Sequence, residues 1–241
     1  MSDTPLLRLT NLTFNYPARE PVIKNLQLQF FQGDRIGLVA PNGSGKTTLF
    51  HLIMGLLKPT SGRIEFMGQQ VVSDEDFAVV RQKIGLLFQD ADDQLFSPTV
   101  IEDVAFGPLN LGYSREEARE ISLKTLEFLG LSDFADRVTF KLSGGEKKLV
   151  SLATVLAMKP EILLLDEPTA GLDRKTKTKL MEILNSLKLS YIIISHEFDF
   201  LKETAHHIYT MEDGKIILDE ELHIHHHEHA HRVGTLPHKH I

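Results

Sequence analysis

The segment APNGSGKTT, residues 40–48, decides how this chain folds. It follows the short apolar run RIGLV (35–39) and precedes apolar residues at helical spacing, Leu49, Leu52 and Ile53. A buried strand, a glycine-rich turn and a helix in this order form a phosphate-binding loop, because small residues let successive backbone N–H groups converge on phosphate at a helix N-terminus. The loop residues assigned to nucleotide binding are Asn42, Gly43, Ser44, Gly45, Lys46, Thr47 and Thr48.

Two side chains of this loop have distinct expected roles. Lys46 is expected to reach the terminal phosphates of ATP, and the Thr47 hydroxyl to bind Mg²⁺. Ala40 stands where the loop pattern has its first glycine, so one extra methyl group enters the turn. A chance Gly/Ser loop is the alternative, and the order of strand, turn and helix disfavours it.

Two kinds of strand pattern surround the loop. The runs IGLLF (84–88), ILLLD (162–166) and YIIIS (191–195) are continuously apolar, as in parallel strands buried on both faces. The segments LLRL (6–9) and LQLQF (26–30) alternate, which is typical of half-exposed antiparallel strands. We therefore predict an α/β fold, a P-loop NTPase (RecA-like) core with an N-terminal antiparallel β subdomain.

Helical signals replace strand signals between about residues 98 and 160. Ser114 followed by Glu117 is a capping box, and Gly130 supplies a helix stop. A second helix is expected to begin near Gly145 and to present its apolar face to the core. These signals predict a helical subdomain, about 98–160, inserted in the α/β core.

Composition limits the classes of partner. The 241 residues carry 33 acidic and 26 basic side chains, a formal charge of -7, so nucleic acid is not expected as a partner. There are no cysteines, which is compatible with a reducing cytoplasm. The N-terminus lacks the pattern of a secretory signal, and the apolar runs are far below the roughly 20 residues of a membrane-spanning helix. Membrane attachment is therefore expected only through a partner.

The run ILLLDE ends with two adjacent acids, Asp166 and Glu167. The carboxyl ends of parallel strands are where α/β proteins bind ligands, and neighbouring strand residues point in opposite directions. Asp166 is therefore predicted to coordinate Mg²⁺, and Glu167 to polarise the water that attacks the γ-phosphate. Two solvated acids at a strand end are the alternative, which the phosphate-binding loop disfavours.

The motif LSGGE at 142–146 resembles the signature of the ABC (ATP-binding-cassette) ATPase family, and the resemblance covers residues 5–220. It implies that a helix N-terminus binds the γ-phosphate of an ATP held by an opposing subunit, so that two ATPase subunits pair as a homodimer or with a close paralogue. The residues that the resemblance assigns to this contact are Leu142, Ser143, Gly144, Gly145 and Glu146.

Four further positions match the family pattern. Tyr16 is similar to the aromatic residue that stacks on adenine, although core packing at a strand end is an alternative. Gln89 is similar to the glutamine that contacts Mg²⁺ and the attacking water, and Asp173, in AGLD, to a residue that communicates across the dimer. His196 is similar to the switch histidine that contacts the γ-phosphate, where a lone histidine is more often structural or exposed. The implied catalytic residues are Glu167, His196 and Gln89.

The segment 90–108, DADDQLFSPTVIEDVAFGP, resembles the energy-coupling-factor and cobalt/nickel branch of importers. That branch implies a transmembrane coupling protein, a membrane substrate-binding component and a peripheral location at the cytoplasmic face of the cell membrane. The chain is then the ATP-hydrolysing subunit that energises import of nickel or cobalt. The alternatives are a vitamin or other small cargo, a soluble ABC ATPase acting on nucleic acid or ribosomes, and a metal-storage protein.

The C-terminal stretch supports a metal cargo. Residues 221–241 form a histidine-rich segment that is expected to be a flexible tail after the ATPase domain, 1–220. Neutral imidazole binds Ni²⁺, Co²⁺, Zn²⁺ and Cu²⁺. The candidate ligands are His223, His225, His226, His227, His229 and His231. An expression tag, a solvated low-complexity tail and fortuitous metal affinity are the alternatives.

Overall fold

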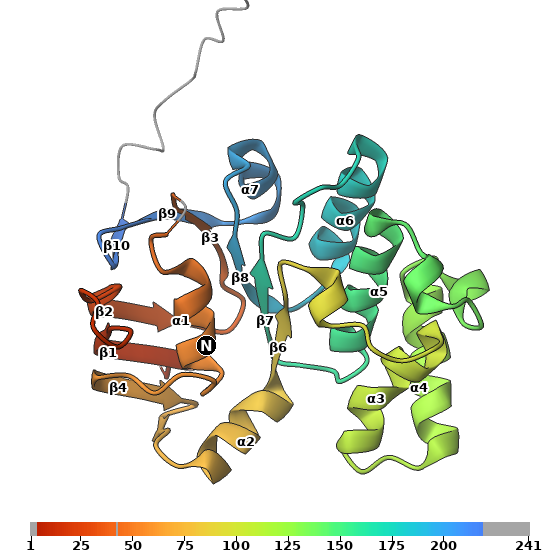
Figure 1. Ribbon diagram of the computed structural model, residues 1–241, viewed down its shortest axis with the longest axis horizontal. Coiled ribbons are helices and arrows are strands. Elements are labelled where there is room, and N and C mark those ends of the chain that lie inside the picture. Colours follow the sequence, from red (N-terminus) through yellow and green to blue (C-terminus); the bar gives the residue numbers. More distant parts are fainter. Residues whose placement is uncertain (1–3, 42, 219–241) are drawn as a thin grey trace, which may run out of the picture.

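The computed structural model describes residues 4–41 and 43–218, and a six-stranded sheet lies at its centre (Figure 1). The strand order is β10-β9-β3-β8-β7-β6. Strands β9, β3, β8, β7 and β6 pair in parallel, and β10 is antiparallel to β9. The bounds are β3 Arg35–Val39, β6 Ile84–Leu87, β7 Ile162–Asp166, β8 Ser190–Ile194, β9 His207–Glu212 and β10 Lys215–Leu218.

The central strands are apolar over most of their length because each contributes to two hydrophobic cores. In β7, Ile162 and Leu164 pack into the core shared with helix α1, whereas Leu163 and Leu165 pack into the core under helices α5, α6 and α7. Alternate side chains of a strand point to opposite faces, so both sets must be apolar. The helices that cover these faces are α1 Lys46–Ile53, α5 Gly144–Leu156, α6 Arg174–Ser186 and α7 Phe198–Thr204.

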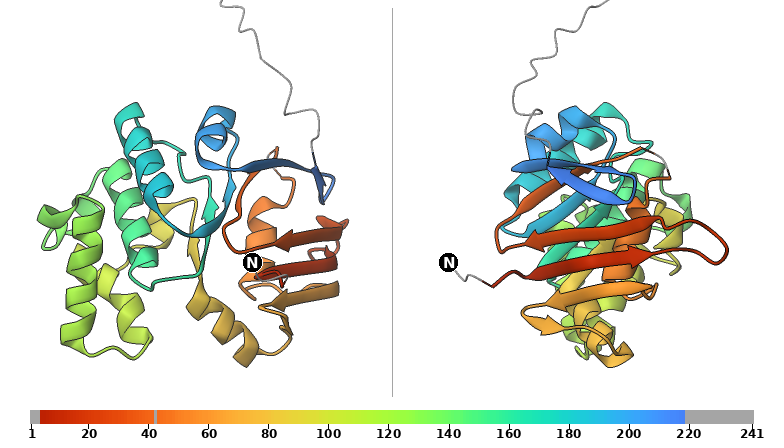
Figure 2. Two further views of the ribbon diagram at one scale, coloured as in Figure 1. Left: turned by 180° about the vertical axis from the view of Figure 1, so that it is seen from behind. Right: turned by 90° about the vertical axis from the view of Figure 1, so that its left-hand side faces the viewer.

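A second sheet of order β2-β1-β4-β5 packs on the same core as α1, and its pairs are antiparallel (Figure 2). Its strands are β1 Leu7–Phe14, β2 Ile23–Phe30, β4 Ser61–Phe66 and β5 Gln69–Gln70. In β2, Leu26, Leu28 and Phe30 are buried while Gln27 and Gln29 are exposed. This alternation is the one read from LQLQF, and the predicted α/β core with an N-terminal antiparallel β subdomain is confirmed.

Helices α3, α4 and α5 lie together on the side of the central sheet away from the second sheet (Figures 1 and 2). The Ser114 hydroxyl accepts from the Glu117 backbone N–H, and Glu117 accepts from the Ser114 N–H, so the capping box opens α4. Gly130, at a φ of 63°, follows its end. Helix α5 begins at Gly144, one residue before the predicted start. The remaining elements of the described residues are α2 Asp74–Lys83, α3 Val100–Asn110, α4 Arg115–Phe128 and the 3₁₀ turns Ala91–Asp93, Ser132–Phe134 and Thr139–Lys141.

Across residues 4–41 and 43–218, no helix is both long enough and apolar enough to cross a membrane.

Candidate active site

The phosphate-binding loop connects β3 to α1 as the sequence predicted. Gly45 precedes the first helical residue with a φ of 95°, and a Cβ there would lie 2.8 Å from Val22 Cγ1 and 2.9 Å from Ile23 Cδ1. Only glycine fits this position without displacing its neighbours. The methyl group of Ala40 packs in the core beside α1, and the backbone of Ala40 does not have the positive φ that would require glycine.

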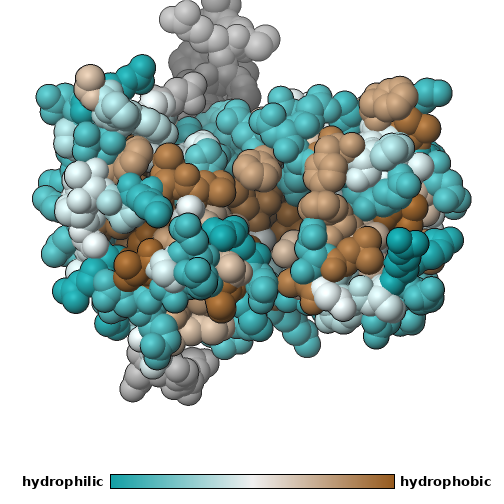
Figure 3. Space-filling model, turned by 60° about the horizontal axis from the view of Figure 1, so that its bottom comes forward, coloured by the Kyte–Doolittle hydropathy of each residue, from teal (hydrophilic) through white to brown (hydrophobic). Residues whose placement is uncertain are grey.

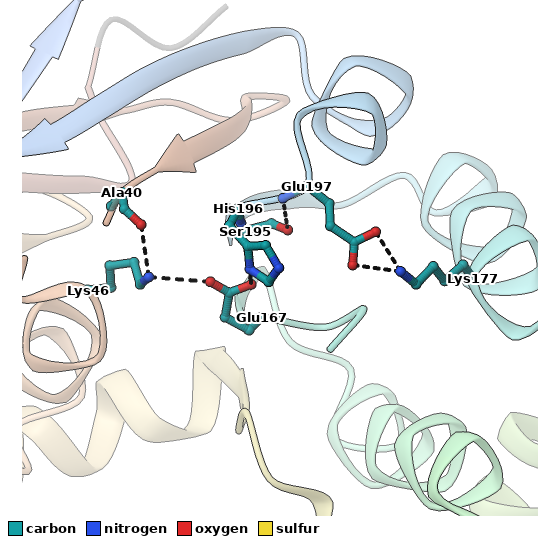
Figure 4. A network of polar contacts seen from close by, with 7 residues as sticks. All are labelled: Ala40, Lys46, Glu167, Lys177, Ser195, His196 and Glu197. Atoms are coloured by element: carbon teal, nitrogen blue, oxygen red, sulfur yellow. Dashed lines mark hydrogen bonds and ion pairs between the residues drawn. The ribbon is translucent and has the colours of Figure 1, made fainter. Parts of the chain in front are cut away.

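Lys46, Glu167 and His196 form one polar network (Figure 4). The Lys46 Nζ donates to the Ala40 carbonyl oxygen at 2.9 Å and lies 3.3 Å from Glu167 Oε1. Glu167 Oε2 lies 2.9 Å from His196 Nδ1. The Lys46 and Glu167 side chains are only 9% and 6% exposed, whereas that of His196 is 67% exposed. A buried carboxylate is thus shared between a buried ammonium and a histidine that faces solvent.

Asp166 turns to a different partner, as expected for neighbouring residues at a strand end. Its Oδ2 accepts a hydrogen bond of 2.7 Å from the Thr47 hydroxyl. Its Oδ1 is buried and has no hydrogen-bond partner among the described residues. Burial raises the pKa of the Asp166 carboxyl, while the Thr47 hydrogen bond opposes this shift. An unpartnered carboxylate oxygen beside a hydroxyl is the oxygen donor set that Mg²⁺ binds, so these residues fit the ion.

A cavity of about 700 Å³ opens beside this network. The Tyr16 hydroxyl lies 3.2 Å from Thr48 Oγ1 at its wall, and the Tyr16 ring packs edge-on against Phe14 at 4.9 Å. Tyr16 therefore faces both the cavity and the core. The predicted residues that line this cavity are Tyr16, Gly43, Gly45, Lys46, Thr47, Thr48, Gln89, Glu167 and His196.

The LSGGE segment is not brought into this cavity. Ser143 is the N-cap of α5, and its backbone N–H and hydroxyl both donate to Glu146 Oε2 at 2.8 Å. These hydrogen bonds, the backbone one first, lower the pKa of the Glu146 carboxyl. Ser143 and Gly144 are exposed, and Gly144 lines a neighbouring cavity of about 860 Å³ together with Gln89. Leu142 is buried and anchors the segment.

The remaining candidates are placed as follows. Asp173 is exposed and caps α6 by accepting from the Thr176 backbone N–H at 2.9 Å, which lowers the pKa of its carboxyl. Asn42 and the histidines of the segment 221–241 lie outside the described residues.

One pair beside the site escaped the sequence analysis. Lys177 Nζ lies 2.8 and 2.6 Å from the two carboxylate oxygens of Glu197, the residue after His196 (Figure 4). The ion pair ties α6 to the segment that carries His196. The position of Glu197 next to His196 is the only signal in the sequence that could have singled it out.

A glycine-rich loop that faces paired carboxylates at the carboxyl end of a parallel sheet defines a P-loop nucleotide hydrolase. Residues 23–170 match the sequence model of the family described as ABC transporter, and the chain belongs to that family. It is an ATP-hydrolysing subunit of a transporter, as the signature motif predicted.

The similar proteins agree with this assignment. The chain is 50% identical over 244 residues to a putative ABC transporter ATP-binding protein of Nitratidesulfovibrio vulgaris, across 100% of this chain and 89% of the relative. It is 41% identical to the energy-coupling factor transporter ATP-binding protein EcfA of Methanothermobacter thermautotrophicus, across 89% of this chain and 70% of the relative.

A solved structure is similar over nearly the same length. It is cbiO1 from Clostridium perfringens, described as part of the ABC transporter complex cbiONQ. The TM-score is 0.80 at 35% identity, covering 90% of this chain and 88% of that one. The predicted resemblance to the energy-coupling-factor branch is confirmed.

Proposed function

We propose that Glu167 is the general base of ATP hydrolysis, positioned by His196 and released by Lys46 when a phosphate binds. The observation that carries the proposal is the sharing of its carboxylate, with Oε1 beside Lys46 and Oε2 beside His196. When ATP binds, a phosphate oxygen competes with Glu167 Oε1 for the Lys46 ammonium. Oε1 can then accept a proton from the attacking water while His196 holds Oε2 in place.

The nucleotide is bound by the loop. Tyr16 stacks on the adenine ring of ATP. The backbone N–H groups of the loop and the side chains of Ser44 and Thr48 surround the phosphates, and Lys46 neutralises the phosphate charge. Ser44 Oγ is buried without a hydrogen-bond partner among the described residues, which suits a phosphate oxygen. Thr47, Asp166 and Gln89 would hold Mg²⁺, which would neutralise charge on the phosphates.

The signature segment, 142–146, serves a second ATPase subunit, either an identical chain or a close paralogue. Its support is that Ser143 and Gly144 are exposed and lie outside the cavity lined by Lys46. An exposed helix N-terminus attracts the γ-phosphate of a nucleotide that approaches from outside. Asp173, exposed at the start of α6, lies where contact with that subunit can be communicated.

A hydrophobic groove of about 420 Å³ between α3 and the central sheet suits a membrane partner. The aromatic side chains of Phe96 and Phe106 are 66% and 48% exposed and stack edge-on at 4.8 Å. Figure 3 shows hydrophobic side chains interrupting the polar surface of the face bordered by α2 and α3. Phe88, the residue before Gln89, lines this groove, so a transmembrane coupling protein seated here lies close to the site. The subunit is then peripheral at the cytoplasmic face of the cell membrane.

The cargo that we propose is nickel or cobalt. Its support is the histidine-rich sequence of 221–241, with imidazole ligands suited to Ni²⁺ and Co²⁺. The alignment to the Nitratidesulfovibrio relative spans 100% of this chain, so these residues are aligned as well, which disfavours an expression tag. The tail binds metal on the cytoplasmic side and does not form the transport path.

Uptake of radioactive Ni²⁺ and Co²⁺ by cells that carry the whole transporter tests this proposal. Three chains are compared: the intact one, Glu167→Gln and a chain truncated after Glu220. Metal uptake that disappears in Glu167→Gln supports metal import, and a changed metal response of the truncated chain supports the role of the tail. Absence of metal uptake with intact ATPase activity contradicts the metal cargo and favours a vitamin or another small molecule.

A further inference from the structure

Lys148 is a buried cation that the hydrolytic network does not use. It lies in the second turn of α5, and only 3% of its surface is exposed. Its Nζ donates to two backbone carbonyl oxygens, Phe88 O at 3.1 Å and Gln89 O at 2.6 Å. Burying an ammonium costs free energy unless its charge and its hydrogen bonds are satisfied, so Lys148 depends on these two carbonyl acceptors.

The surroundings of Lys148 connect it to the magnesium side of the site. It lines the cavity of about 860 Å³ that Thr47, Gln89 and Asp166 also line. Burial lowers the pKa of Lys148, while the charges of Asp90 and Asp166 oppose the shift. The ammonium therefore contacts the Gln89 backbone and lines the same cavity as the carboxylate that fits Mg²⁺.

Other contacts also join the loop after β6, which contains Phe88 and Gln89, to helix α5. Gln94 Nε2 donates to Ser151 O and to Thr154 Oγ1 of α5, both at 2.9 Å. Lys147, the neighbour of Lys148 on α5, pairs with Asp92. Of these ties, only the one from Lys148 ends on the Gln89 backbone itself.

We propose that Lys148 is a positioning residue, whose ammonium holds the Phe88 and Gln89 carbonyl groups against α5 and so fixes where the Gln89 side chain enters the site. The inference rests on the proposed role of Gln89 in hydrolysis. Because Ser143 is the N-cap of α5, one helix then joins the signature segment to Gln89. A displacement of α5 moves the Gln89 backbone with it.

A double-mutant cycle tests this coupling. Lys148→Met removes the ammonium and keeps the apolar stem, so kcat for ATP hydrolysis is expected to fall roughly 10- to 100-fold, as for a catalytic group displaced by about 1 Å. KM for ATP is expected to stay within about 3-fold, because the loop that binds the nucleotide is untouched. In a Gln89→Ala background, Lys148→Met is expected to lower kcat by less than about 2-fold, because the two residues act as a unit.

The matched control is Lys124→Met, which removes an exposed lysine paired with Glu120 on α4 of the same helical layer and is expected to leave kcat unchanged. If Lys148→Met is insoluble, the same cycle is run with Lys148→Gln, which retains N–H donors without the charge and is expected to lose less activity. Equal losses in both backgrounds, or a normal kcat in Lys148→Met, would overturn the inference. The role of Gln89 is tested separately, since Gln89→Ala alone must lower kcat for that role to stand.

Discussion

Replacing Glu167 by glutamine separates the binding of ATP from its hydrolysis. The wild-type carboxylate has two acceptor oxygens, one near Lys46 at 3.3 Å and one near His196 at 2.9 Å. Glutamine of nearly the same shape offers one acceptor oxygen and cannot take a proton. Loss of a positioned general base lowers turnover roughly 10²- to 10⁴-fold, which corresponds to about 3–5 kcal/mol of activation free energy.

The affinity for ATP is expected to survive this change. A bound phosphate replaces Glu167 as the partner of Lys46, so the variant loses little that the nucleotide complex requires. Phosphate release measured at saturating ATP gives kcat, and equilibrium titration with ATP gives Kd. Glu161→Gln is the control, because this exposed carboxylate pairs with Lys83 at 2.9 Å away from the site. A kcat of Glu167→Gln within about 3-fold of the wild-type value would refute the assignment of the base, since general-base catalysis supplies at least about 10²-fold.

Three further changes probe the loop and its metal side. Lys46→Ala removes the buried ammonium and is expected to weaken ATP binding by about 1.5–3 kcal/mol, the usual value of hydrogen bonds to a charged group; undiminished affinity in calorimetric titration contradicts this role. Gly45→Ala places a Cβ 2.8 Å from Val22 at a positive φ and is expected to lower the free energy of unfolding by about 1–3 kcal/mol in urea titrations. Asp166→Asn removes a carboxylate whose pKa is raised by burial. The folded wild type holds that proton more tightly than the unfolded chain, so stability falls as pH rises from the ordinary carboxyl range through the raised pKa. In Mg²⁺-free buffer, Asp166→Asn should therefore be more stable than the wild type above that pH window, and its free energy of unfolding should depend less on pH. A pH profile of stability that is the same in both proteins would contradict the burial effect.

The central strands were predictable because burial on both faces of the sheet requires apolar side chains at successive positions, which the sequence shows directly. The segment ILLLD is apolar at its first four positions and ends on Asp166 at the edge of the sheet, and β7 begins and ends at the predicted residues since both faces are covered. Helix α2 was not predicted, because only Phe77 and Val80 of its ten residues are buried and the apolar periodicity is correspondingly weak. Strand β9 likewise has a single buried residue, Met211.

The site was predictable where its chemistry is local in the sequence. The loop at 40–48 and the acids 166 and 167 are each contiguous, and the order of the parallel strands brings them together. The ion pair of Lys177 with Glu197 joins residues 20 positions apart, and Lys148 bonds to carbonyls about 60 positions away. Such contacts depend on how helices pack against loops, which no short pattern in the sequence contains.

The placement of β7 between two cores has a mechanical consequence. The strand carries the nucleotide-binding half of the molecule on one face and the helical half on the other, and Asp166 and Glu167 stand at its tip. Were one half to rotate against the other about this strand, the two carboxylates at its tip would lie close to the axis of rotation. Displacement grows with distance from such an axis, so the distal end of α4, at the margin of Figure 1, would then move much farther than the two carboxylates. A large movement at the periphery is thereby compatible with a fixed chemical centre.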